Sequence, residues 1–294
     1  MEFRTLRAFV EVVRQGGFSQ AARTVFATQS TISKAVKQLE DEFGLPLLDR
    51  IGHRSLLTAA GRVVYRHGVK LLAGRDDLLA ELDEIRELKQ GALRLGLPPV
   101  GSSILFAPLF AVYRQRYPGI EVRLVEHGSA QLQESLSAGE IDLAGVLLPT
   151  SPDFDWHTVT REPLVALLPA DHRFADSRSI SLSDLKDTPF ILFEDGFALH
   201  RVILDASRRA GFEANIIAQS SQIDFMIGLV GAGLGVAFLP RMIAIQRRNS
   251  SVRQVLLDDA GTEWIMAIAW RRDAYLSGAA KAWLNLVREV HGEN

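Results

Sequence analysis

Residues 18–61 read FSQAARTVFATQSTISKAVKQLEDEFGLPLLDRIGHRSLLTAAG, and this stretch decides the fold of the N-terminal part of the chain. Its first run of apolar residues at helical spacing consists of Ala21, Ala22, Val25 and Phe26. Ser19 is a suitable N-cap for this run, and Thr28 caps a second run that Gly44 ends. The sequence therefore predicts two helices joined by a tight turn, the second of them over residues 29–43.

The predicted helix over residues 29–43 has two chemically different faces. One face is an apolar stripe made of Ile32, Val36, Leu39 and Phe43. The opposite face carries short polar and basic side chains near its N-terminal end, namely Gln29, Ser30, Thr31, Ser33, Lys34 and Lys37. A helix buried on one side and polar on the other is suited to the major groove. We therefore expect the chain to bind double-stranded DNA.

Individual members of this polar face suit different parts of the duplex. The amide of Gln29 can pair with adenine, and Lys34 can reach guanine or a phosphate. Hydroxyls near helix N-termini suit backbone phosphates, and three serines supply them: Ser19, Ser30 and Ser33. Ser19 has an equally good interpretation as a helix cap alone.

Residues 45–58 are predicted to form a short two-stranded wing that turns at Gly52. Arg50 and Arg54 flank the tip of this wing, where they would lie beside phosphates or enter the minor groove. The alternative is that both are ordinary surface arginines.

The same stretch resembles the signature of the LysR-type transcriptional regulator family. The resemblance keeps order and spacing through Gln29 to Lys34, Leu39-Glu40, Gly44, Pro46 to Leu48, Arg50 and Leu57 to Gly61. Two positions depart from the pattern: many members have proline in place of Ser30, and phenylalanine is commoner at Leu48. The resemblance implies a winged helix-turn-helix that reads promoter DNA, in a protein that assembles as a homodimer and then as a homotetramer.

The charge of the chain is unevenly distributed. Residues 1–75 contain twelve Lys and Arg against six Asp and Glu, a net charge of +6. Because the whole chain has a formal charge of −2, the remainder carries −8. A basic end on an acidic body favours an N-terminal contact with phosphate, although a solvated charged surface is the simpler alternative.

Composition limits the other classes of protein. The 294 residues suit two or three domains, and the chain has no cysteine for disulfides or thiolate metal sites. No apolar run is long enough for a membrane span, and the N-terminus lacks a secretory pattern, so we expect a cytoplasmic protein. The seven histidines form no close ligand pairs, and we expect no metal and no cofactor.

A long helix is predicted from the cap at Thr58 to about Leu88. Its apolar residues recur every seven positions as Val64, Leu71, Leu78 and Ile85. This is more apolar surface than a small winged domain can cover, so we expect pairing with a second copy. The alternative is an amphipathic helix that packs only on its own domain. The resemblance implies a linker helix that pairs two subunits, and Lys89 to Gly91 marks a hinge.

Beyond the hinge, short apolar strands alternate with helices, as in residues 92–97, 141–148, 164–169 and 264–270. This alternation predicts mainly parallel sheets covered on both sides. A weaker resemblance to the regulatory half of LysR-type proteins continues through Tyr117-Pro118, Gly139 to Asp142, Leu168 to His172 and Gly231 to Ala237. It implies two α/β lobes like those of type 2 periplasmic binding proteins, with a small-molecule effector between them.

The expected organisation is therefore an α/β chain with an N-terminal all-α winged helix-turn-helix. We place that domain at residues 1–58, the linker and dimerisation helix with its hinge at 59–90, and the effector domain at 91–294. Lobe I would comprise residues 91–163 and 267–294, and lobe II residues 164–266.

Effector contacts are expected at strand C-terminal ends and helix N-termini in both lobes. The expected residues are Ser102, Ser103, Gly128, Ser129, Leu147, Phe193, Phe197, Ser221 and Gln222. Hydroxyls and free amides at Ser102 and Ser103 favour a carboxylate, unless these serines are only a helix cap. Glu194 and Asp195 would repel an anion and instead suit an amine or a hydroxyl.

No pattern in the sequence predicts an enzyme. The glycine-rich run at residues 231–237 has neither the spacing nor the strand-to-helix order of a nucleotide-binding loop. Two alternatives to a ligand-responsive regulator remain open. One is a DNA-binding scaffold without an effector, and the other is a solute-binding protein, which would leave the N-terminal third unexplained. RNA polymerase is a further candidate partner, and no membrane partner is expected.

Overall fold

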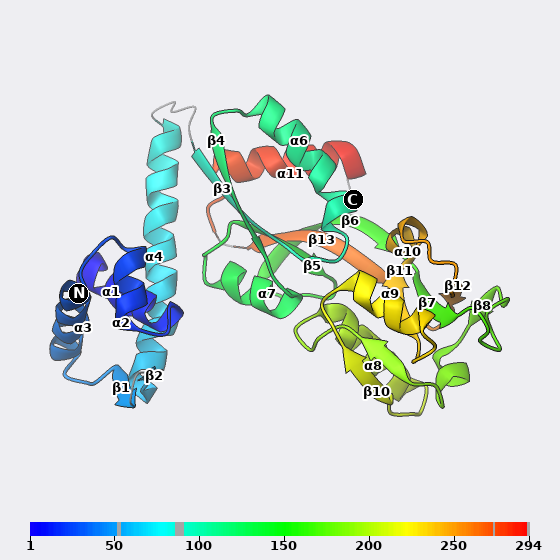
Figure 1. The fold of residues 1–294 in the computed structure, drawn as a ribbon. Helices are drawn as coiled ribbons and strands as arrows, with labels where there is room; N and C mark the ends of the chain where they lie inside the picture. The colour runs from blue at the N-terminus through cyan, green and yellow to red at the C-terminus, as the bar shows by residue number, and fades with distance from the viewer. Residues whose placement is uncertain (52–53, 86–90, 273, 293–294) are drawn as a thin grey trace. The chain divides into compact units, whose positions relative to one another are not determined.

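The computed structural model describes residues 1–51, 54–85, 91–272 and 274–292. The chain divides into two compact units, an N-terminal unit of residues 1–88 with 138–140 and a C-terminal unit made of the remainder (Figure 1). None of the helices in the described part of the chain has the length and apolar character needed to cross a bilayer.

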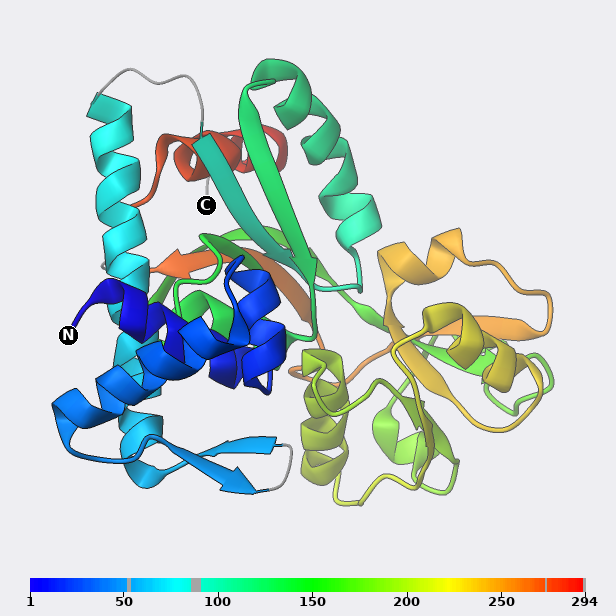
Figure 2. The same ribbon diagram turned by 60° about the vertical axis from the view of Figure 1, so that its left-hand side comes forward.

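The N-terminal unit is a helical core with one hairpin. Its elements are α1 (Phe3–Arg14), α2 (Phe18–Thr24), α3 (Gln29–Phe43), β1 (Leu48–Ile51), β2 (Arg54–Leu57) and α4 (Ala59–Ile85). Helix α1 packs against the three other helices, and Figure 2 shows the short helices gathered along α4. The core includes Phe9 from α1, Leu39 from α3 and Leu72 from α4, all buried.

Helix α3 begins and ends where the sequence predicts. The Thr28 hydroxyl oxygen accepts a hydrogen bond from the Thr31 amide at 3.2 Å, so it caps the first turn. Gly44 ends the helix in the left-handed conformation, with φ of 66°. The buried side of the helix is formed by Ile32, Val36 and Leu39.

Three expectations for the helix pair are wrong. Helix α2 begins at Phe18 with Gly17 as its N-cap, so Ser19 lies inside the helix and its hydroxyl bonds to α3 instead. Phe26 lies beyond the end of α2 with a φ of 54° and its side chain 99% exposed, because the chain has already turned away from the core. Phe43, at the last turn of α3, is 38% exposed rather than part of the buried stripe.

The carboxylate of Glu40 on α3 holds the start of the wing. Glu40 Oε1 accepts hydrogen bonds from the backbone amides of Leu47 at 2.8 Å and Leu48 at 3.2 Å. Strands β1 and β2 then pair antiparallel, from Leu48 opposite Leu57 to Ile51 opposite Arg54. The turn predicted at Gly52 lies outside the described residues.

The C-terminal unit contains two lobes, of which the first is built on a five-stranded sheet in the order β4-β3-β5-β13-β6. Its elements are β3 (Gly91–Leu97), α5 (Ser102–Leu105), α6 (Ala107–Arg116), β4 (Ile120–Glu126), α7 (Ser129–Ser137), β5 (Leu143–Leu147), β6 (Phe154–Glu162), β13 (Trp264–Arg271) and α11 (Gly278–His291). Helices α6 and α11 pack together on one face, and α7 covers the other (Figure 1). Burial raises the pKa of the Tyr113 phenol on α6, so its hydroxyl stays protonated and donates to the Ala279 carbonyl at 2.8 Å.

The second lobe contains a four-stranded sheet in the order β11-β7-β12-β8 and a two-stranded sheet, β10-β9. Its elements are β7 (Leu164–Pro169), β8 (Ser179–Ile180), the 3₁₀ helix η1 (Leu182–Leu185), β9 (Phe190–Leu192), α8 (Ala198–Arg209), β10 (Ile216–Gln219), α9 (Ile223–Gly231), β11 (Ala237–Pro240), α10 (Arg241–Gln246) and β12 (Val252–Leu257). The two-lobed α/β architecture agrees with the sequence-based expectation.

The sheets are not mainly parallel, and this expectation is wrong. Strand β3 runs parallel to β4 and β5, but β13 is antiparallel to both of its neighbours, β5 and β6. In lobe II, β7 is likewise antiparallel to β11 and β12. The cause is the crossing between lobes. The chain leaves lobe I along β6 and returns along β13, so these two strands must run in opposite directions.

We expect Glu40→Ala to destabilise the N-terminal unit by about 1.5–3 kcal/mol, because two backbone amides lose a charged acceptor. Hydrogen exchange on the full chain measures this through the amides of α3 and the wing. Asp41→Ala is the matched control, since Asp41 is exposed and contacts Lys37 only at 3.7 Å, an arrangement that contributes about 0.3–0.5 kcal/mol. Equal protection in the two variants would contradict the assigned role of Glu40.

Candidate DNA-binding face and interlobe site

The face of α3 opposite its buried stripe carries the polar residues that the sequence singled out. Gln29, Ser30, Lys34 and Lys37 are exposed, while Thr31 and Ser33 are half-buried. Ile32, Val36 and Leu39 hold the other side of the helix in the core. The burial of one face therefore fixes the direction in which the polar face points.

Hydrogen bonds order the N-terminal turn of this face. The Ser19 hydroxyl on α2 donates to Gln29 Oε1 at 3.2 Å, which leaves the two amide hydrogens of Gln29 free to point outward. The Thr28 hydroxyl lies 2.9 Å from the Ser30 hydroxyl and 2.8 Å from the Thr31 hydroxyl. Ser19, predicted as a phosphate contact or a cap, thus holds the amide of the residue predicted to read a base.

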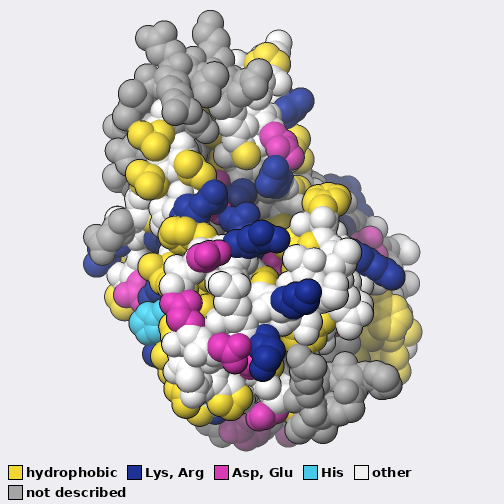
Figure 3. Space-filling view, turned by 90° about the vertical axis from the view of Figure 1, so that its left-hand side faces the viewer, with side chains coloured by type: hydrophobic (Ala, Val, Ile, Leu, Met, Phe, Trp, Pro, Cys, Tyr) yellow, Lys and Arg dark blue, Asp and Glu magenta, His cyan; other side chains and the backbone are white. Residues whose placement is uncertain are grey.

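The charge of α3 changes along its length. Lys34 and Lys37 lie in its first half, whereas Glu40, Asp41 and Glu42 lie in its last turns. All three acids are engaged within the unit, Glu40 by the wing, Glu42 by the N-terminal amine of Met1, and Asp41 by Lys37 at 3.7 Å. Figure 3 shows several Lys and Arg side chains gathered among apolar ones on the face of the molecule that it presents. The basic end of the helix is therefore the end suited to a polyanion.

The wing arginines are placed only by their backbone. Arg50 pairs with Ser55 and Arg54 with Ile51 in the β1–β2 ladder, which puts them near the tip of the hairpin. Their side chains lie outside the described residues.

The expected effector serines have different surroundings. Ser102 is buried, and its hydroxyl donates to the carbonyl oxygen of Pro98, so the chain itself already occupies this donor. Ser103 is exposed, and α5, which begins one residue earlier at Ser102, has only four residues. Ser129 at the start of α7 is buried, with 6% of its surface exposed. A carboxylate is therefore less favoured at Ser102 and Ser103 than the sequence predicts.

The two lobes touch through a pair of glycines. The Ala130 amide donates to the carbonyl oxygen of Gly196 at 3.4 Å, joining α7 of lobe I to the loop before α8 of lobe II. A Cβ atom built on Gly128 would lie 2.6 Å from that same oxygen. This approach is closer than any residue with a side chain permits, so Gly128 allows the observed contact between lobes.

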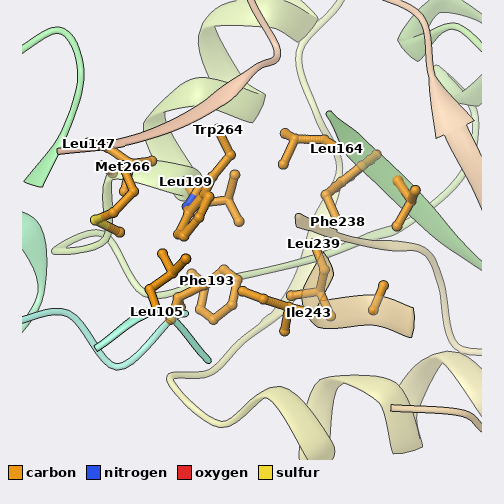
Figure 4. Close-up of a cluster of buried hydrophobic side chains, with 14 of the residues drawn as sticks. Leu105, Leu147, Leu164, Phe193, Leu199, Phe238, Leu239, Ile243, Trp264 and Met266 are labelled. Carbon is orange, nitrogen blue, oxygen red and sulfur yellow. The ribbon is translucent and has the colours of Figure 1, made fainter. Parts of the chain in front are cut away.

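A continuous apolar cluster lies where the lobes meet (Figure 4). Leu105 and Leu147 enter it from lobe I, and Phe193 and Leu199 from lobe II. Leu147 and Phe193, both predicted as effector contacts, are members of this cluster, and Phe197 stacks on Phe193 with ring centroids 5.3 Å apart. The predicted residues Ser221 and Gln222 are exposed at the start of α9 and are not part of this cluster.

Trp264 is a member of this cluster that the sequence analysis did not single out. It lies at the start of β13, where the chain returns to lobe I, and it is 1% exposed. Its indole Nε1 is buried and has no hydrogen-bond partner among the described residues. Its ring fills the space beside Gly101, where a Cβ would lie 2.6 Å from the ring. A buried donor without an acceptor marks a position where a ligand oxygen would be stabilised.

The acidic loop of lobe II is held within its own lobe. Asp195 Oδ1 lies 3.3 Å from His200 Nε2 and accepts a hydrogen bond from Gln219 at 2.9 Å. The other ring nitrogen of His200 lies 2.7 Å from the Phe193 carbonyl oxygen. Across the described residues, no group of three or more acidic, histidine or cysteine side chains could hold a metal ion.

Two family models match the chain. A model described as LysR substrate binding domain matches residues 86–292, and one described as bacterial regulatory helix-turn-helix protein, lysR family, matches residues 3–62. The chain is 39% identical over 285 residues to the uncharacterized HTH-type transcriptional regulator YwbI of Bacillus subtilis, covering 97% of this chain and 95% of that protein. It is 34% identical to the HTH-type transcriptional regulator BudR of Raoultella terrigena, over 92% of this chain and 95% of that protein.

Solved structures share the fold over nearly the whole length. A variant of full-length OxyR from Pseudomonas aeruginosa superposes with a TM-score of 0.70 at 25% identity, covering 98% of this chain and 95% of that one. CbnR, described as a LysR family transcriptional regulator, gives a TM-score of 0.67 over all of both chains. Its identity is 19%, so this likeness concerns the fold alone.

We expect Gly128→Ala to separate the two lobes locally, because its Cβ would lie 2.6 Å from the Gly196 carbonyl oxygen. This oxygen belongs to the backbone, so it can move away only if the chain around Gly196 shifts. Amide exchange in residues 193–200 should become faster. Gly196→Ala is the matched control, since a Cβ there meets nothing within 4 Å. If both variants exchange like the unmodified chain, the glycine contact does not hold the lobes together.

Proposed function

Because this chain belongs to the LysR family of bacterial transcriptional regulators, we propose that its α3 helix reads promoter DNA and that a ligand between its lobes controls this contact. The family and the fold expected from the sequence are confirmed. The observation that carries the proposal is the polar, basic first half of α3, exposed opposite a buried stripe. We propose that the protein works in the cytoplasm, since that is where it would meet promoter DNA.

The proposed DNA contacts divide into reading and positioning roles. Gln29 and Lys34 are exposed on the first half of α3 and would reach base edges in the major groove. Ser30, Thr31 and Ser33 would contact the backbone beside them, with Lys37 adding charge at the groove edge. Arg50 and Arg54 near the wing tip would contact phosphates or the minor groove.

The proposed effector site is the apolar cluster between the lobes. Its lining from Leu105, Leu147, Phe193 and Phe197 favours a small, largely apolar molecule. The unpartnered Nε1 of Trp264 would donate to one oxygen of that molecule. Ligand binding would then favour one lobe arrangement over another and so change the affinity for DNA.

An effector-independent scaffold remains the alternative to this proposal. In a scaffold the lobes transmit nothing to α3, so Gly128→Ala and Gly196→Ala would bind the same DNA with the same affinity. In the proposed regulator, the variant with separated lobes binds DNA with an altered affinity, and the matched control does not.

Helix α4 is proposed as the dimer contact. Val69 and Leu72 face the core of the N-terminal unit and are buried. Elsewhere on the helix Val64 is half-buried against that core, whereas five large apolar side chains are at least 41% exposed, namely Val63, Leu71, Leu78, Leu79 and Leu82. Such a row on one helix favours pairing with a second copy, and two such dimers would form the proposed tetramer. Ile85, the last member of the predicted seven-residue repeat, has no described side chain.

We expect Gln29→Ala and Lys34→Ala each to weaken binding to the operator by about 10- to 100-fold, because each removes a base-edge contact. Footprinting and fluorescence anisotropy on the chain's own upstream region measure this loss at several salt concentrations. Lys34→Ala should also lower the slope of affinity against salt if it contacts a phosphate. Lys186→Ala removes an exposed charge from lobe II and serves as the control. Operator affinities equal to that of Lys186→Ala would refute the assignment of α3.

We expect Leu78→Glu to shift the chain from dimer to monomer, since a carboxylate would be buried in the proposed contact. Analytical ultracentrifugation of the full chain gives the oligomeric state. Leu256→Glu alters an exposed leucine of lobe II and is the matched control. A dimer that persists in Leu78→Glu at micromolar concentration would rule out α4 as the main contact.

A further inference from the structure

Phe26 combines two unfavourable features at one position. Its side chain is 99% exposed, although it is one of the largest apolar side chains in the protein. Its φ is 54°, and among the described residues no other non-glycine residue has a positive φ. A bulky side chain in this backbone region is strained, and an exposed ring gains nothing from burial.

Folding alone does not account for a phenylalanine here. The turn conformation is the one that glycine adopts at no cost and asparagine at little cost. Hydrogen bonds hold the turn itself, because the Phe26 amide donates to the Arg23 carbonyl at 3.3 Å and the Ala27 amide to the Ala22 carbonyl at 2.9 Å. Val25 and Ala27, on either side, already pack against the core. The backbone at Phe26 is therefore strained, although its ring does not contribute to the core of the N-terminal unit.

The position of Phe26 indicates what the ring contacts. The turn joins the end of α2 at Thr24 to the start of α3 at Gln29, so Phe26 lies three residues before the proposed base reader. The Ser19–Gln29 hydrogen bond draws the start of α2 to the same place. When a recognition helix enters the major groove with its N-terminal residues, the turn before it lies at the groove edge. Backbone strain of this kind concentrates at functional sites.

We propose that Phe26 is a DNA contact, whose ring packs on apolar surface of the duplex at the edge of the groove. Two parts of DNA have this chemistry, the deoxyribose of the backbone and the C5 methyl group of thymine. The contact would exclude water beside Gln29 and help to hold α3 at a fixed depth. This inference rests on the proposed function of α3 and adds an apolar contact to its polar ones.

The test separates the ring from the strain by three substitutions. Phe26→Asn removes both, Phe26→Ala removes the ring but keeps the positive φ on a residue with a Cβ, and Phe26→Tyr keeps the ring. We expect operator affinity to fall about five- to tenfold in the Asn and Ala variants and to be retained in the Tyr variant. Because no charge is lost, the slope of affinity against salt should stay unchanged.

The stability of Phe26→Asn should rise although its affinity for the operator falls. Thermal unfolding of the full chain should show a higher midpoint for Phe26→Asn, because asparagine tolerates the turn conformation, and no such gain for Phe26→Ala. Operator affinity of Phe26→Asn equal to that of the unmodified chain would overturn the proposal. A change in oligomeric state in place of a change in affinity would also overturn it, since the ring would then serve a protein contact.

Two further comparisons complete the test. If the unmodified chain binds no upstream DNA, the proposed function of α3 fails, whereas weak binding by Lys34→Ala with normal binding by Phe26→Asn refutes Phe26 alone. Replacing operator thymines with deoxyuridine one at a time distinguishes the two DNA surfaces. If one replacement weakens binding and Phe26→Ala causes no additional loss of affinity on that DNA, the ring contacts the methyl group of that thymine. If no replacement weakens binding, the ring contacts the deoxyribose.

Discussion

The burial of one side of α3 against α1 is the constraint on which the N-terminal unit depends. Ile32, Val36 and Leu39 can enter the core only in one rotational setting of the helix, and that setting turns Gln29 and Lys34 outward. The caps at Thr28 and Gly44 then fix the length of the helix. The carboxylate of Glu40, one turn from the end, attaches the wing to the same rigid body. The proposed DNA contact and the stability of the unit thus depend on opposite faces of one helix.

The C-terminal unit uses close packing in a comparable way. Gly128 and Gly101 each lack the Cβ that would push a neighbour away, one from the Gly196 carbonyl and the other from the Trp264 ring. The apolar cluster between the lobes is consequently continuous. In such a region an unpaired indole N–H is unfavourable. A hydrogen bond from this N–H to a ligand oxygen would therefore be stronger than the same hydrogen bond in water.

Local chemistry made part of this structure predictable from the sequence. The bounds of α3 follow from a threonine cap, a glycine stop and an apolar period, all within one short segment. The positions of Ser19 and Phe26 did not follow, because they depend on how α2 meets α3 in space. Strand β6 has a weak signal in the sequence, since polar residues that include Asp155, His157 and Arg161 interrupt its apolar ones. Its partner β13 lies about a hundred residues away, so no local pattern predicts this pairing or the buried position of Trp264 between the lobes.

The crossing between the lobes has a mechanical consequence. One residue, Pro163, separates β6 from β7, and its carbonyl oxygen is bonded to the Arg241 amide at 2.9 Å. The return strand begins at Trp264, directly opposite Glu162 at the end of β6. The outgoing and returning strands are therefore hydrogen-bonded to each other at the point where the chain passes between the lobes. A displacement of lobe II has to move both crossing segments together, because neither can shift alone without breaking this ladder.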